Sequence, residues 1–117
     1  MAEGRADFTR TFRGLAEGTA AAEFADPGLF TDWETSWRAR LAVEADPETV
    51  MRAANPAYIA RNHRVEEAIR AATGGDFAPF HRLNAVLARP FDRRTEAEGY
   101  DAAPAPEEAV TRTFCGT

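Results

Sequence analysis

The sequence NPAYIARNH at residues 55–63, which runs on into RVEEAI at residues 64–69, decides how this chain is organised. A proline fixes its own φ angle and keeps the preceding residue out of the helical region, so Pro56 must end a helix at Asn55. Helical spacing of apolar residues resumes at Val65. The stretch therefore predicts a sharp, defined junction between two helices rather than a loose loop.

Two helices are predicted at the start of the chain. Apolar residues recur three or four positions apart over residues 7–24, with charged residues between them, which is typical of an amphipathic helix. Residues 26–28, Asp-Pro-Gly, are interpreted as a break, and a second helix over residues 32–45 takes Thr31 or Asp32 as its N-cap. The apolar residues on which these predictions rest are Phe8, Phe12 and Leu15 in the first helix and Trp33, Trp37 and Leu41 in the second.

Three further helices are predicted around the junction. Residues 46–48, Asp-Pro-Glu, supply a capping aspartate and a proline suited to the first helical position, so a short third helix starts there. A fourth helix ends at Gly74 and Gly75, and a fifth is capped by Asp76 and stopped by Pro90. Their apolar faces are Val65, Ala68, Ile69 and Ala72, and then Phe80, Leu83 and Leu87. The predicted fold class is all-α, with about five short helices and no strand.

The sequence divides into a helical subdomain, residues 1–91, and an extended, proline-containing tail, residues 92–117, which ends in the segment with Cys115. The tail is polar and contains too few apolar groups to fold by itself. It is therefore expected either to remain mobile or to lie on a surface that another segment supplies. Cys115 is the only cysteine, so it is free or pairs with a group outside the chain.

Composition limits both the size of the core and the kind of partner. A chain of 117 residues with 44% hydrophobic content has room for one modest core, and a net charge of −5 argues against a nucleic-acid surface. No apolar run approaches the roughly 18 residues of a membrane span, so we expect no membrane partner and a cytoplasmic location. All 14 basic residues are arginine. Without lysine, the chain can form no Schiff base and has no ammonium to hold a phosphate.

Several motifs of the chain resemble one known protein family. The motif MxxxNPxYIxRNHxVExAI at residues 51–69 carries most of the likeness. The residues that form its signature are Asn55, Pro56, Tyr58, Arg61, Asn62 and His63. Shorter matches are DFTxxFRxL at residues 7–15, the pair Trp33 and Trp37 with Arg40 and Leu41, GDF at 75–77, LARP at 87–90 and the terminal FCGT at 114–117. Together they resemble the C-terminal region of the selenoprotein O family, also called YdiU.

The resemblance implies a fold and an activity for the complete protein. Members of the family are kinase-like proteins that transfer AMP from ATP to hydroxyl groups of protein substrates, with magnesium. The family's nucleotide-binding lysine and metal-binding residues lie upstream of the matched region, so the resemblance implies no catalytic, cofactor-binding or metal-binding residue in this chain. It implies instead a C-terminal fragment whose partner is the missing kinase-like core. The final Gly116 and Thr117 depart from the family's usual ending, which weakens a redox role for Cys115.

The signature allows two interpretations. Arg61, Asn62 and His63 could position a carboxylate or phosphate from a partner, because arginine presents a planar fork suited to such groups. The structural interpretation is favoured: Asn62 caps the fourth helix, Arg61 pairs with a nearby acid, and His63 is exposed in the first turn. A stand-alone helical module that binds another protein and carries a free C-terminal thiol is the alternative to the fragment.

The remaining candidates are weighed in the same way. Trp33 and Trp37 could stack on a base or another aromatic ligand, but tryptophans at helical spacing more often pack in a core or between domains. His63, His81 and Cys115 fit no common zinc-ligand spacing, so no metal site is predicted. Cys115 is kept as a possible redox thiol, since a chain terminus is exposed.

Overall fold

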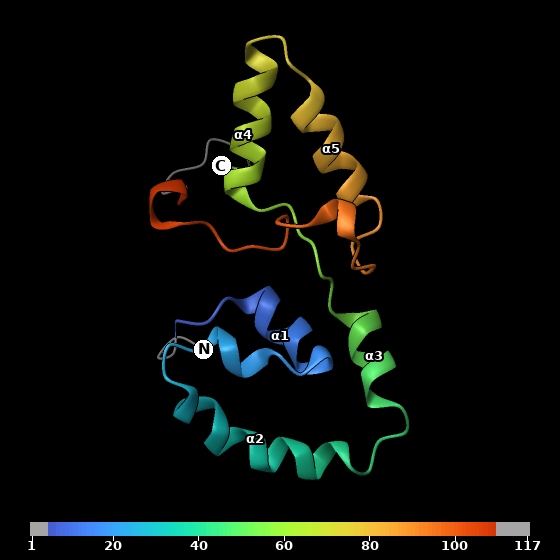
Figure 1. Ribbon diagram of the computed structural model, residues 1–117. Coiled ribbons are helices and arrows are strands. Elements are labelled where there is room, and N and C mark those ends of the chain that lie inside the picture. Colours follow the sequence, from blue (N-terminus) through green and yellow to red (C-terminus); the bar gives the residue numbers. More distant parts are fainter. Residues whose placement is uncertain (1–4, 110–117) are drawn as a thin grey trace, which may run out of the picture. The chain divides into compact units, whose positions relative to one another are not determined.

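A computed structural model describes residues 5–109 of the chain, and within that range it contains only helices and no strand (Figure 1). The all-α prediction is therefore confirmed. The α helices are α1 (Phe8–Glu17), α2 (Pro27–Leu41), α3 (Pro47–Ala54), α4 (Asn62–Thr73) and α5 (Ala78–Leu87). The structure also contains three short 3-10 helices: η1 (Ala20–Glu23) lies between α1 and α2, and η2 (Thr95–Ala97) and η3 (Pro106–Glu108) follow α5. No helix in this part of the chain is long and apolar enough to cross a membrane.

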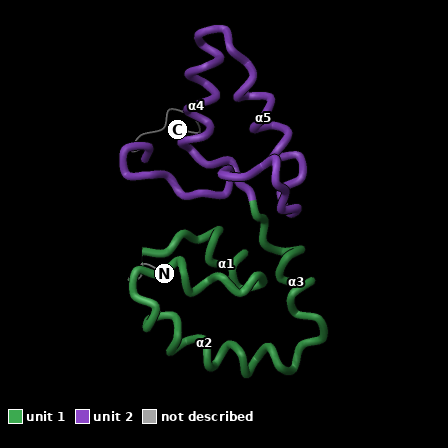
Figure 2. The backbone as a smooth tube through the Cα atoms, in the orientation of Figure 1, with its two compact units in different colours: residues 1–57 green, residues 58–117 purple. Residues whose placement is uncertain are grey.

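Contacts divide the chain into two compact units, one ending at Ala57 and the other beginning at Tyr58 (Figure 2). Unit 1 holds α1, η1, α2 and α3, and unit 2 holds α4, α5, η2 and η3. The boundary falls inside the stretch that was predicted to be a junction. The predicted division into residues 1–91 and 92–117 separates helices from tail and stays a prediction.

The first helix is shorter than predicted. Asp7 caps α1 by accepting a hydrogen bond from the backbone nitrogen of Arg10 at 3.0 Å. The helix ends at Glu17 because Gly18 has a φ of +78°, a left-handed conformation that glycine adopts without strain. The chain then turns back so that η1 packs on α1, and the single helix predicted over residues 7–24 is wrong beyond residue 17.

The second helix begins earlier than predicted, and the interpretation of residues 26–28 as a break is wrong. Asp26 is the N-cap of α2, and its carboxylate accepts a hydrogen bond from the Gly28 nitrogen at 3.0 Å. Pro27 occupies the first turn, where its missing N–H costs nothing. The predicted N-caps Thr31 and Asp32 therefore lie inside the helix. An aspartate followed by a proline is a start signal here, and the glycine after it does not cancel that signal.

The third helix and the end that the junction imposes on it agree with the prediction. The helix α3 begins at Pro47 and ends at Ala54, with Asn55 in an extended conformation. The backbone nitrogen and the side-chain amide of Asn55 both donate to the carbonyl oxygen of Met51, each at 2.9 Å, so the junction residue closes the last turn of the helix. Asp46 differs from the prediction: it has a φ of +50° and its side chain makes no capping hydrogen bond.

In unit 2, α4 and α5 are neighbouring helices that pack against each other (Figure 1). The predicted glycine end of α4 is confirmed, with Gly74 as the C-cap. The N-cap of α5 is Phe77, so Asp76 lies one residue before the position predicted for it. Its carboxylate still accepts a hydrogen bond from the nitrogen of residue 78, the first residue of the helix, at 3.0 Å. The predicted apolar stripe of α5 is only partly right, because Leu83 is buried but Phe80 is 48% exposed. Val86, one turn after Leu83, completes the buried face instead.

The described part of the tail, residues 92–109, lies on unit 2 rather than standing apart. Ala97 and Tyr100 are buried, although the sequence around them is polar. Arg64 of α4 donates a hydrogen bond to the carbonyl oxygen of Gly99 at 3.1 Å. The expectation that the tail lies on a surface supplied by another segment therefore holds for residues 92–109, because α4 and α5 supply that surface. Cys115 lies outside the described residues.

Candidate functional site

The six signature residues are shared between the two units. Asn55 and Pro56 lie near the end of unit 1, and Tyr58 is the first residue of unit 2, which also contains Arg61, Asn62 and His63. Each half is held by an arginine from a distant part of the same unit. The signature therefore consists of two parts, and side-chain contacts within each unit hold the part that belongs to it.

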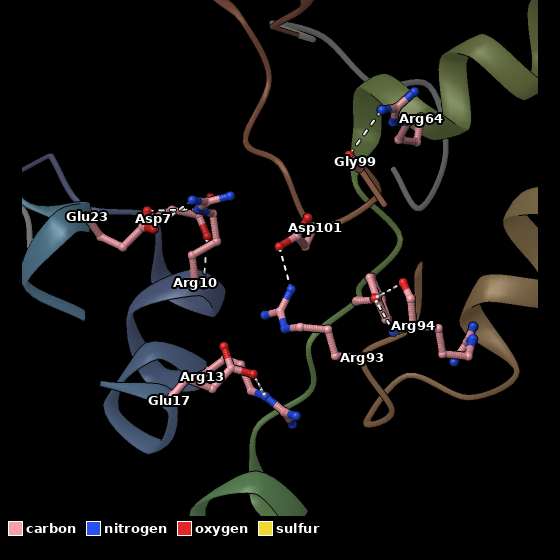
Figure 3. Close-up of polar contacts among 11 residues, drawn as sticks. Asp7, Arg10, Arg13, Glu17, Glu23, Arg64, Arg93, Arg94, Gly99 and Asp101 are labelled. Atoms are coloured by element: carbon pink, nitrogen blue, oxygen red, sulfur yellow. Dashed lines mark hydrogen bonds and ion pairs between the residues drawn. The ribbon is translucent and has the colours of Figure 1, made fainter. Parts of the chain in front are cut away.

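Arg13 anchors the unit 1 half. Its guanidinium donates hydrogen bonds to the carbonyl oxygens of Arg52 at 3.1 Å and Asn55 at 3.0 Å, and its Nε donates to the Glu17 carboxylate at 2.8 Å. Its pairing with Glu17 is drawn in Figure 3. The side chain of Arg13 is only 6% exposed. A buried cation at the C-terminal end of α3 satisfies carbonyl groups that have no partner within the helix and complements the negative end of the helix dipole.

Arg13 was not among the site residues predicted from the sequence. A helical wheel places it between the apolar residues of the first helix, where charged residues are normally exposed. Its spacing of four residues from Glu17 was the available signal, because such pairs lie on the same helix face. That spacing does not indicate the contact with α3, which is distant in sequence.

Tyr58 anchors the unit 2 half, and it is 2% exposed. Its backbone nitrogen donates to the carbonyl oxygen of Pro90 at 3.1 Å, and its hydroxyl accepts a hydrogen bond from the Arg94 nitrogen at 3.0 Å. The Arg94 guanidinium lies 5.6 Å from the centre of the Tyr58 ring and donates to the carbonyl oxygens of Arg89 at 2.7 Å and Val86 at 3.1 Å. Arg94 therefore stabilises the end of α5 while it covers Tyr58.

The Arg61 to His63 segment differs in part from its predicted role. Asn62 is the first residue of α4, and Arg61, which is buried, occupies the N-cap position without a side-chain cap. The predicted cap by Asn62 is therefore wrong. His63 is partly exposed in the first turn. These three residues line an open hollow of about 320 Å³ together with Ile59 and Pro104 and two alanines.

Unit 1 contains a second, mainly apolar hollow of about 350 Å³, which we call the apolar hollow. Its walls come from α1, α2 and the segment between them. The lining residues are Thr11, Phe12, Leu15, Phe24, Leu29, Phe30 and Trp33. Trp33 is 49% exposed and stacks on Trp37 with ring centres 5.6 Å apart, so Trp33 is not a core residue of the described unit. The expectation of interdomain packing for the two tryptophans stays a prediction.

The sequence is similar to that of known proteins of one family. No protein-family model matches the sequence. The chain is 51% identical to Protein nucleotidyltransferase YdiU from Ruegeria sp. TM1040 and 50% identical to the protein of the same name from Ruegeria pomeroyi. It is 51% identical to that of Rhodopseudomonas palustris BisB5. The chain is a relative of the YdiU proteins. Each match covers 100% of this chain.

The chain spans about a quarter of the length of the YdiU relatives, with 25% of the two Ruegeria proteins and 26% of the Rhodopseudomonas protein covered. The resemblance drawn from residues 51–69 is therefore confirmed. Residues 5–109 contain no group of three or more histidine, cysteine or acidic residues that could hold a metal. The carboxylate of Glu67, the residue next to Glu66, forms an ion pair with the guanidinium of Arg64 at 3.0 Å.

Proposed function

We propose that this chain is the helical C-terminal portion of a YdiU-type protein nucleotidyltransferase and that it serves that enzyme as a structural part. In the complete protein, AMP would pass from ATP to hydroxyl groups of protein substrates, with magnesium, in the cytoplasm. The observation that carries the proposal is the match of the entire chain, at about 50% identity, to a quarter of proteins named for nucleotidyl transfer.

The use of arginine in the structure supports a structural role. The guanidinium groups of Arg13 and Arg94 donate hydrogen bonds to backbone carbonyls at the ends of α3 and α5. Arg64 likewise donates to a carbonyl of the tail and lies 4.9 Å from the centre of the Tyr100 ring. Cations that bind phosphate keep their donors directed toward the ligand, whereas these three hold segments of the chain together. The nucleotide site would then belong to the part of a YdiU protein that this chain does not span.

Isothermal calorimetry tests the proposal directly. The 117-residue chain, titrated with ATP and magnesium, is expected to show no stoichiometric binding. Incubation with labelled ATP and an acceptor protein is expected to transfer no AMP, whereas the complete Ruegeria relative is expected to do so. Stoichiometric nucleotide binding by the isolated chain would contradict the structural role.

The apolar hollow and the half-exposed Trp33 favour a second candidate, a stand-alone helical module that binds another protein. The two candidates differ in how the isolated chain melts. A stand-alone module has to fold by itself, so its thermal unfolding is expected to be one sharp cooperative transition. A fragment that lacks its partner surface is expected to unfold in a broad transition. Circular dichroism at increasing temperature distinguishes them.

A further inference from the structure

Residues 95–101, the part of the tail that begins at η2, lie against α4, and we call this segment the strap. Ala97 and Tyr100 are its only buried residues, and its other residues are exposed or half-buried. Its regular structure is the three-residue helix η2, which is too short to persist without support from neighbouring segments. Few buried side chains and exposed backbone hydrogen bonds are typical of segments that open locally in native proteins.

Arg64 of α4 holds the strap, but one of its donors is left unsatisfied. Its guanidinium donates to the carbonyl oxygen of Gly99 at 3.1 Å and lies 4.9 Å from the centre of the Tyr100 ring (Figure 3). The Nε atom of the same group is buried and has no hydrogen-bond partner in the described part of the chain. A buried donor without a partner destabilises the state that buries it. The net stabilisation of the closed strap by this arginine is therefore small.

The strap is also loosely packed against Tyr58. An open hollow of about 490 Å³ is lined by Tyr58, Arg93 and Arg94 and by three strap residues, Thr95, Glu98 and Asp101. Arg93 and Asp101 form an ion pair at 2.7 Å, but their side chains are 44% and 25% exposed. Ion pairs that are exposed to water add little to stability. Contacts on this side therefore hold the strap weakly.

Arg94, the residue that precedes the strap, is firmly held. Its side chain is 10% exposed, and its guanidinium donates to the carbonyl oxygens of Arg89 at 2.7 Å and Val86 at 3.1 Å. Its backbone nitrogen donates to the Tyr58 hydroxyl at 3.0 Å. The chain is thus fixed at the end of α5 up to Arg94 and weakly held after it. Hinges are commonly a few residues at the end of such a fixed element.

We propose that the strap is a lid that opens about Arg94 as one unit while α4 and α5 stay folded. Opening exposes Tyr100 and the Arg64 guanidinium, which the closed strap covers, and removes one wall of the hollow beside Tyr58. The surface of unit 2 therefore exists in two forms without any change in its helices. The proposal concerns contacts within unit 2 alone, so it goes beyond the proposed function and does not rest on it.

Native-state hydrogen exchange of the 117-residue chain, measured by NMR at low denaturant concentrations, tests the proposal without a substitution. The amides of Ala97, Glu98 and Tyr100 donate to backbone carbonyls three residues earlier. These three amides are expected to share one opening free energy, because they are released together. The amides in the middle of α4 and α5 are expected to have protection factors at least about tenfold larger.

Substitutions at Tyr100 test whether the strap opens separately from the helices. Tyr100→Ala removes the largest buried side chain of the strap and is expected to speed exchange at Ala97 and Glu98 at least about tenfold. The amides of α4, α5 and Arg94 are expected to keep their protection. Tyr100→Leu keeps an apolar side chain but removes the ring beside Arg64, and it is expected to speed strap exchange roughly two- to fivefold. Phe91→Ala, at a residue outside the strap that is 43% exposed, is the control and is expected to leave strap exchange unchanged.

Three results would overturn the proposal. If Tyr100→Ala speeds exchange in α4 and α5 as much as in the strap, the strap and the helices unfold together and no separate lid exists. If Ala97 and Glu98 show different opening free energies in the unsubstituted chain, the strap frays residue by residue. If the Arg94 amide is accelerated by the same factor as Ala97, the hinge does not lie at Arg94.

Discussion

Replacement of Arg13 by methionine tests whether a buried guanidinium holds α3 in place. Methionine keeps most of the apolar stem of arginine and removes every donor. The substitution leaves the carbonyl oxygens of Arg52 and Asn55 without their side-chain donor, and it leaves Glu17, whose side chain is 19% exposed, without its cation. The expected result is a large loss of stability in unit 1.

The magnitude follows from burial. Removal of one partner from a buried, hydrogen-bonded ion pair costs roughly 3–5 kcal/mol, and the lower figure suits Arg13 because Glu17 retains some contact with water. The matched control is Arg38→Met. Arg38 also pairs with a glutamate four residues away, Glu34, at 2.6 Å, but its side chain is 69% exposed. Pairs of that exposed kind contribute only about 0.3–0.5 kcal/mol.

Thermal unfolding followed by tryptophan fluorescence is the suitable assay, because both tryptophans of the chain lie in unit 1. For a chain of this size, Arg13→Met is expected to lower the melting temperature by roughly 10 °C, and Arg38→Met by no more than about 2 °C. Arg13→Lys, which keeps the charge and loses the planar fork, is expected to lie between them. Equal shifts for Arg13→Met and Arg38→Met would refute the reasoning, because only Arg13 is buried and donates to backbone carbonyls at the end of α3.

Two further substitutions test unit 2 and the packing of α1. Tyr58→Phe is expected to cost about 1 kcal/mol and to speed hydrogen exchange at the Arg94 amide, whereas Tyr100→Phe, which keeps its ring, is expected to leave that amide unchanged. Gly14→Ala is expected to destabilise the chain more than Gly74→Ala in a denaturant melt. The added Cβ at Gly14 would lie 2.9 Å from the first backbone nitrogen of η1, whereas at Gly74 it makes an ordinary contact at 3.5 Å.

Local signals predicted the helices well where a short sequence decides them. The start of α3 at Pro47 and its end at Asn55 follow from φ restrictions that proline imposes on itself and its neighbour. The same kind of signal is present at Asp26 and Pro27, where the sequence was interpreted as a break, and the structure shows that the aspartate caps a helix there. The Asp26 carboxylate and the Gly28 nitrogen that donates to it belong to residues only two positions apart, so this cap could have been predicted from the local sequence.

Nonlocal contacts explain what the sequence did not predict. Arg13 reaches a carbonyl 42 residues away, and no periodicity along one helix indicates such a partner. η1 approaches α1 closely at Gly14, where a larger side chain would not fit, and the half-buried Phe12 lines the apolar hollow. Hydrophobic spacing located the apolar side of the helix, but it could not show whether the chain itself covers that side.

Every basic residue of this chain is arginine, including those that hold the ends of α3 and α5, and the sequence contains no lysine. Lysine is the residue whose side-chain amine is acetylated. Acylating reagents and lysine acetyltransferases therefore find no side-chain amine in the chain. A label directed at amines can attach only at the amino terminus, which leaves every helix cap described above unmodified.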